Sequence, residues 1–114
     1  MLPLRVTREI FFEMTIRIAN APCSWGILEF EGMAESLPWS TVLDEMAASG
    51  YEGTELGDWG FMPTEPNLLV AELQGRGLSL LGAFVPIALA DVHAFQRGLQ
   101  SALKIAQLLA AVGK

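Results

Sequence analysis

The sequence predicts an α/β protein made of three consecutive βα units with parallel strands. Three short apolar runs, starting near residues 15, 53 and 78, each end in a polar or aromatic loop and are followed by a stretch with helical periodicity. Strands that alternate with helices in this way are typical of a parallel sheet, and repetition of the unit indicates a barrel. The hydrophobic content of 52%, with a mean hydropathy of +0.39, fits strands that are buried on both faces.

The first unit begins with a strand predicted over residues 15–19, which are rich in β-branched side chains. A long loop, 20–37, follows, and loops of this length in a compact domain usually have a function. A helix is predicted over 38–49. Pro38 is expected in its first turn, where a missing N–H costs nothing, with the cap residue just before it.

The second unit consists of a strand over 53–56, a loop over 57–64 and a helix that ends at the glycines 75 and 77. Thr64 is predicted to cap this helix, with Pro66 near its first position.

The third unit has the most apolar strand, predicted over 78–85 and ended by Pro86, which cannot donate to a sheet ladder. Asp91 is predicted to cap a helix that runs to Gly113. Apolar residues recur along it at spacings of three and four, which indicates an amphipathic helix. These residues are Phe95, Leu99, Ala102, Leu103, Ala106, Leu109 and Ala110.

We expect the chain to consist of two parts. Residues 1–13 fit no βα period and are predicted to be an N-terminal extension, while 14–114 form the three βα units. Three units are too few to close a barrel, so we expect either self-association or a partner that supplies the remaining strands.

The composition argues against several classes of partner. A net charge of −6 and a pI near 4.6 give the chain no electrostatic attraction to nucleic acid or to an anionic membrane surface. The longest nearly apolar run, 78–90, is too short to span a bilayer. Cys23 is the single cysteine, so an intrachain disulfide is impossible, and the N-terminus does not read as a signal peptide. These features predict a cytoplasmic protein.

Three segments carry a resemblance to a known family. They are Ile18–Gly26 (IANAPCSWG), Gly50–Gly57 (GYEGTELG) and Leu81–Pro86 (LGAFVP). They resemble the start of the xylose isomerase-like TIM barrels, and most closely the inosose dehydratase type and its sugar phosphate isomerase and epimerase relatives. On this resemblance, 14–114 is a parallel βαβαβα fragment, the first three βα units of an eight-unit barrel that usually has about 250 residues.

The resemblance implies a chemistry. Complete family members are expected to be isomerases, epimerases or lyases that act on a small polyol or sugar with the help of a divalent metal, Mn or Co. The metal ligands belong to later strands, so this chain alone is expected to bind no metal and to hold no catalytic residue. The residues carried over as substrate contacts are Trp25, Glu55, Trp59 and Pro86.

Each of these residues also has a structural interpretation. Glu55 can accept hydrogen bonds from hydroxyl groups or help to move a proton, or it can be a structural carboxylate paired with Arg17. Trp25 and Trp59 can stack on the apolar face of a polyol or belong to the core. Cys23 has no histidine near it in sequence and is expected to be a small buried thiol rather than a nucleophile.

Two functional hypotheses remain open. The chain is either the N-terminal part of a sugar or inositol isomerase, epimerase or dehydratase, incomplete and inactive alone, or a non-catalytic truncated product or half-barrel module that assembles through its exposed edges. His93, the only histidine, is expected to be a surface residue and not a metal ligand.

Overall fold

A computed structural model describes residues 15–27 and 37–113. The predicted N-terminal extension, 1–13, and half of the predicted loop 20–37, residues 28–36, lie outside these residues. The elements, in chain order, are β1 (Ala19–Asn20), a 3₁₀ turn (Pro22–Trp25), α1 (Trp39–Ala48), β2 (Gly53–Glu55), α2 (Pro66–Gln74), β3 (Ser79–Gly82) and α3 (Val92–Val112).

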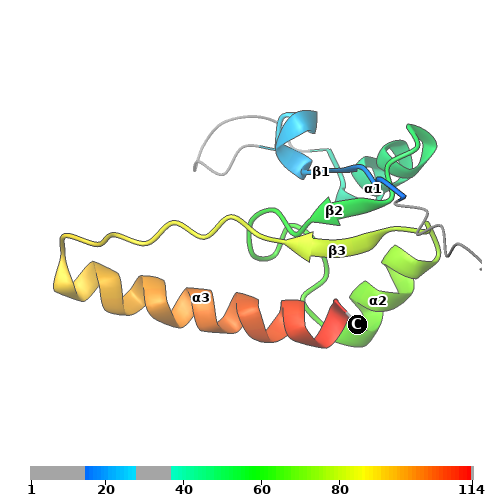
Figure 1. Cartoon of the computed structure of the whole chain (residues 1–114). Helices are drawn as coiled ribbons and strands as arrows, with labels where there is room; N and C mark the ends of the chain where they lie inside the picture. Colours follow the sequence, from blue (N-terminus) through cyan, green and yellow to red (C-terminus); the bar gives the residue numbers. More distant parts are fainter. Residues whose placement is uncertain (1–14, 28–36, 114) are drawn as a thin grey trace, which may run out of the picture.

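The described strands form one parallel sheet in the order β1-β2-β3, which confirms the predicted α/β class and βαβαβα order. The register pairs Ala19 with Gly53 and Gly53 with Ser79. A bulge lies between Thr54 and Glu55. Within the described part of the chain the sheet is open, so β1 and β3 are both edge strands (Figure 1).

The helices bury only one face of the sheet. Leu80 of β3 is 7% exposed and packs in a cluster with residues of α1, α2 and α3, whereas the next residue, Leu81, is 63% exposed. Successive side chains of a strand point to opposite faces, so Leu81 marks the face that no described helix covers. The main cluster consists of Leu43, Leu56, Met62, Leu69, Leu73, Leu78, Leu80, Ile105 and Leu108.

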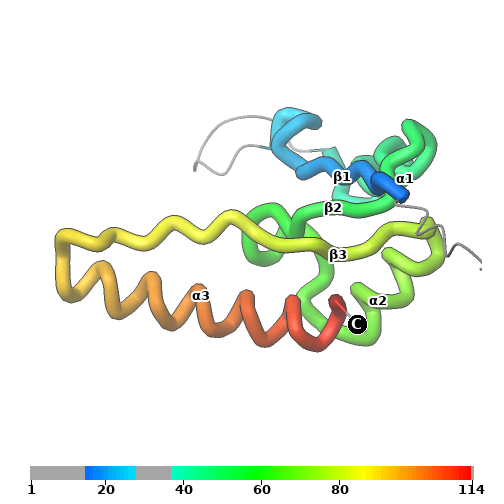
Figure 2. Tube along the Cα trace, viewed as in Figure 1, coloured from blue at the N-terminus to red at the C-terminus, as the bar shows by residue number. Residues whose placement is uncertain are grey.

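The chain leaves the sheet after β3 in an extended segment, residues 83–91, before α3 runs back beside it (Figures 1 and 2). Gly98 of α3 permits this close approach, because a Cβ there would lie 3.0 Å from Cγ2 of Ile87. Asp91 caps α3 as predicted, with its Oδ1 accepting from the N–H of Ala94 at 2.7 Å.

All three predicted strands are longer than the observed ones, the second by one residue, Leu56. The first was expected over 15–19, but ladder pairing includes only Ala19 and Asn20. The third was expected over 78–85, but it ends at Gly82, where its carbonyl accepts from the N–H of Leu56. β2 itself ends at Glu55, which pairs with Gly82, so the extended backbone that follows β3 has no partner strand among the described residues.

Two of the predicted caps are wrong. Pro38 is itself the cap of α1, because its ψ of 140° keeps it outside the helix while its carbonyl accepts from the N–H of Val42. Glu65, not Thr64, caps α2. Pro66 occupies the first helical position, so the cap is the residue directly before it, and the Glu65 carboxylate accepts from the N–H groups of Asn67 and Leu68.

Candidate functional site

A hollow of about 320 Å³ lies at the carboxyl ends of the three strands. It is lined by Ala19, Asn20, Ala21, Glu55, Leu81 and Gly82. The end of β2 supplies Glu55, and Leu81 belongs to the uncovered face of the sheet. In open α/β sheets, ligands bind outside the carboxyl ends of the strands, so this hollow is the candidate site.

Among the described residues, Glu55 is the only one with an ionisable side chain that lines this hollow. It is exposed, and the described residues place no ion pair on its carboxylate. The proposed pairing with Arg17 is wrong. The guanidinium of Arg17 instead meets Oε2 of Glu52 at 2.6 Å and Oγ of Ser79 at 3.2 Å. Ser79 is the first residue of β3 and pairs with Gly53, the first residue of β2, so this network lies nearer the amino ends of the strands. The Glu55 carboxylate therefore remains available to a ligand.

Trp25 packs against α1 and does not line the hollow. Its indole Nε1 donates to Oε2 of Glu45 at 2.7 Å, and its ring meets Tyr51 edge to face with centroids 6.4 Å apart. These contacts fasten the turn after β1 to the outer helix layer. The bond to Glu45 occupies the N–H of the indole. The role of Trp25 as a substrate contact stays a prediction.

Trp59 and Pro86 also lie away from the hollow. Trp59 is 38% exposed, and Nζ of Lys104 lies 4.2 Å from its ring centroid, a cation–π contact that ties the loop after β2 to α3. Pro86 lines a second, shallow hollow between the extended segment and α3, beside Arg97 and Ser101. The described structure does not bring the four predicted contacts into one pocket, and the roles of Trp59 and Pro86 stay predictions.

Asn20 is a lining residue that the sequence analysis did not single out as part of the site. Its Oδ1 accepts from the N–H of Ala21 at 2.8 Å and from Oγ of Ser24 at 2.7 Å. The signal for it was an asparagine at the end of a strand, directly before a small residue and a proline. Such a side chain commonly turns back onto the following backbone.

Cys23 is exposed, so the expectation of a buried thiol is wrong. The 3₁₀ turn buries Pro22 and turns the next residue outward. His93 is exposed on the first turn of α3, as expected for a surface residue.

Arg76 connects helices α1 and α2, which pack beside the sheet. Its guanidinium donates to the carboxylates of Glu72 and Asp44, at 2.6 Å each, and lies over the ring of Trp39. These bonds, first that of Glu72 and then that of Asp44, raise the pKa of Arg76 further above its usual value, so the side chain is charged at every accessible pH. It links the end of α2 to α1 and keeps the core under the hollow in place.

Arg76→Met should therefore lower the free energy of unfolding by about 1–2 kcal/mol, because the partly buried bond to Glu72 and the exposed bond to Asp44 are lost at once. Chemical denaturation measures the change. Arg97→Met is the matched control, because the described residues give Arg97 no ion pair, and it should leave stability nearly unchanged. Equal effects of the two substitutions would contradict the structural role of Arg76.

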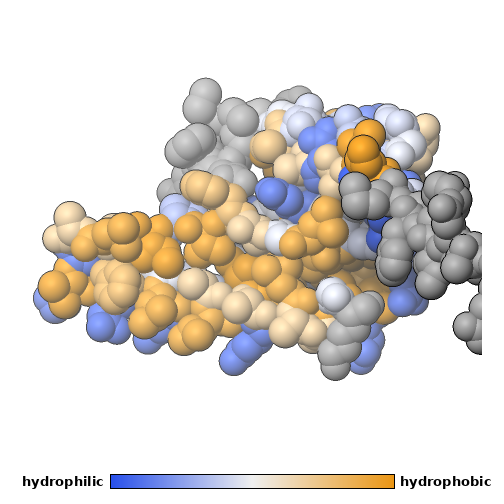
Figure 3. All heavy atoms as spheres, in the orientation of Figure 1, coloured by the Kyte–Doolittle hydropathy of each residue, from blue (hydrophilic) through white to orange (hydrophobic). Residues whose placement is uncertain are grey.

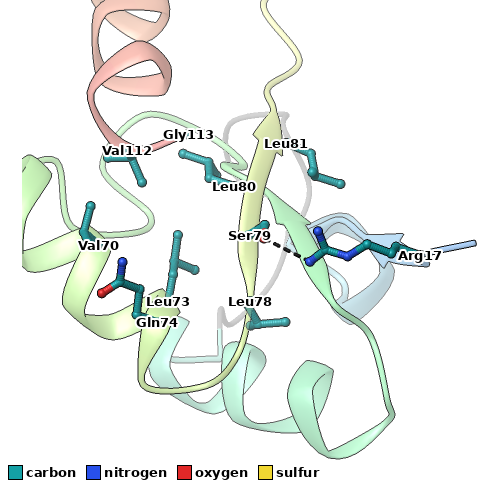
Figure 4. Close-up of a pocket in the computed structure, with 10 residues that line it drawn as sticks. All are labelled: Arg17, Val70, Leu73, Gln74, Leu78, Ser79, Leu80, Leu81, Val112 and Gly113. Atoms are coloured by element: carbon teal, nitrogen blue, oxygen red, sulfur yellow. Dashed lines mark hydrogen bonds between the residues drawn. The ribbon is translucent and has the colours of Figure 1, made fainter. Parts of the chain in front are cut away.

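A third hollow, of about 460 Å³, opens along the free edge of β3 (Figure 4). Leu80 lies on one side and Val70, Leu73 and Val112 lie on the other, so the α2 and α3 side chains approach the strand without a further strand between them. The hollow lies beside unpaired backbone of β3, where a sheet can add another strand.

The described residues do not fit a divalent metal. No group of three or more His, Cys, Asp or Glu side chains comes together in residues 15–27 and 37–113. The described part of the site therefore offers a carboxylate and apolar surface. Among the same residues, no helix has the length and apolar character needed to cross a membrane.

Comparisons with known proteins identify two relatives. The chain is 30% identical over 97 residues to an inosose dehydratase of Geobacillus kaustophilus strain HTA426, a match that covers 85% of this chain and 31% of that protein. It is 31% identical over 71 residues to an inosose dehydratase of Lacticaseibacillus casei, covering 62% of this chain and 23% of that protein. The chain thus spans less than a third of either relative. No family model and no solved structure matches it.

Proposed function

We propose that the chain is the N-terminal part of an inosose dehydratase-like lyase that acts on a cyclic polyol or related sugar. The observation that carries this proposal is the 30% identity over 97 residues to an inosose dehydratase, in a chain whose parallel βα units end in a hollow with a free carboxylate. Isomerase or epimerase chemistry on a similar substrate is the alternative within the same family.

In this proposal Glu55 contacts the substrate. Its carboxylate accepts hydrogen bonds from hydroxyl groups and can take or return a proton next to a carbonyl. Leu81 and the small residues at the end of β1 offer apolar surface to the ring carbons. The remaining strands, and the metal ligands expected on them, would continue the sheet from β3, where the hollow of Figure 4 leaves room beside the strand.

A chimaera tests the proposal. Residues 14–114 would replace the matching segment of the Geobacillus kaustophilus inosose dehydratase. The hybrid is expected to dehydrate inosose, because the transplanted units supply the same wall of the site. A hybrid in which the same segment comes from an unrelated parallel βα protein is the control. A folded but inactive chimaera would contradict the proposal.

The chain alone should show no dehydratase, isomerase or epimerase turnover with added Mn²⁺ or Co²⁺. The reason is that the described residues gather no set of three metal ligands around any point. Assays with inosose and ketose substrates on the purified chain check this expectation. Metal-dependent turnover that persists after a second purification would show that the chain holds a complete centre.

The second candidate function is a non-catalytic module that assembles through its open sheet. The observation that favours it is the 63% exposure of Leu81 on the uncovered sheet face. An inactive chimaera together with a stable complex between the chain and another protein would favour this function over the first.

A further inference from the structure

Helix α3 has two apolar faces. Ile105 and Leu108 are 7% and 4% exposed and pack into the core, but a second set of apolar residues lies on the outside of the helix. We call this set the outer stripe. It consists of Val92, Leu99, Leu103, Ala106 and Ala110, all of them exposed.

The outer stripe is continuous and faces away from the sheet. At about 100° per residue, its five positions fall within about 60° of arc, roughly opposite the buried pair. A helix beside α3 in the same layer would contact its flank and leave the outer stripe open. Figure 1 shows α3 running along the margin of the molecule, and in Figure 3 apolar atoms extend over α3 and the segment before it.

The charged residues of α3 indicate what kind of partner can cover the outer stripe. Between Val92 and Val112 the sequence has no Asp or Glu, although the whole chain has a net charge of −6. The polar flank next to the stripe consists of the uncharged side chains Gln96, Gln100 and Gln107. Two copies of the chain, which repel each other through most of their acidic surface, can therefore bring their α3 helices together without opposing like charges.

The length of the outer stripe determines which residues meet when two α3 helices pair. From residue 92 to residue 110 it extends about 27 Å, at 1.5 Å per residue, and its midpoint lies between Leu99 and Leu103. In an antiparallel pair related by a two-fold axis, Leu99 contacts the partner's Leu103, and Val92 contacts the partner's Ala110. The bulky residues then meet in the middle, and the small alanines let the helix ends approach.

We infer that the outer stripe of α3 is a self-association surface, occupied by the same stripe of a second copy in antiparallel orientation. With a width of about 10 Å, the stripe offers on the order of 300 Å² per copy. Stable interfaces bury about 800 Å² per partner, so the dimer is weak and forms in a concentration-dependent manner.

Sedimentation equilibrium on the full chain between low and high micromolar concentration tests this surface. The chain should associate, and Leu99→Lys or Leu103→Lys should weaken association at least tenfold, because each places a charge at the centre of the pair. Gln100→Lys is the control, since it adds the same charge to the same helix outside the stripe, and it should change association much less. Circular dichroism shows that each variant keeps its helix.

Cysteine pairing tests the orientation without adding charge. In chains with Cys23→Ser, a mixture of the Leu99→Cys and Leu103→Cys variants should form the mixed disulfide faster than either variant forms its own dimer. A parallel pair would reverse that preference. A monomer at every concentration, association that the lysine variants leave unchanged, or association lost instead through Leu81→Lys on the sheet face would each overturn the inference.

Discussion

Replacing Glu55 by Gln in the active chimaera should lower kcat/KM for inosose by about a hundredfold or more, the usual scale for the loss of a proton-transferring carboxylate. The amide is nearly isosteric with the carboxylate, and Glu55 is exposed at the end of β2 with no described ion pair to lose. Stability should therefore change little. Steady-state kinetics together with a thermal melt separate the two effects.

Asp58→Asn is the matched control for this experiment. Asp58 is an exposed carboxylate three residues further along the chain, and it does not line the hollow. Its substitution should leave kcat/KM within about twofold of the parent, far from the change expected of a catalytic carboxylate. If Glu55→Gln instead unfolds the chimaera while activity per folded molecule is unchanged, Glu55 is a structural residue.

The sequence predicted what depends on local chemistry. Asp91 was identified as a cap because a carboxylate before an amphipathic run satisfies the free N–H groups of a first helical turn, and this contact needs no distant partner. The α/β class followed from alternating periodicities in the same way. At α2 the same reasoning placed the cap at Thr64, one residue too early. Pro66 is the first residue of the helix, so the cap is Glu65.

The sequence could not predict features that depend on distant contacts. The strand expected over 78–85 ends at Gly82 because the neighbouring strand β2 ends at its partner Glu55, 27 residues earlier in the chain. The partner of Arg17 is Glu52 and not Glu55, a choice set by the register of β1 on β2. Similarly, Trp25 and Trp59 each contact a residue of a helix, Glu45 and Lys104, which no spacing in the sequence indicated.

The isolated chain should not behave as a compact, cooperatively melting monomer. Leu81 is 63% exposed where the sheet lacks a covering layer, and the edges of β1 and β3 are open in the described structure. An open apolar edge is a template for pairing with another chain. We expect dye binding and a broad thermal transition, measured by fluorescence and circular dichroism.

The size of the effect follows from the apolar area left in contact with water. Burial contributes about 25 cal/mol per Å² of apolar surface, so leaving one whole face of the sheet in water can cancel the small net stability of a domain of this size. Leu81→Lys should reduce dye binding, because it places a charge at the centre of the uncovered face. Leu103→Lys, on the outer side of α3, is the matched control and should reduce it less. A monodisperse monomer near 12.4 kDa that melts cooperatively and binds no dye would show that this face is stable in water.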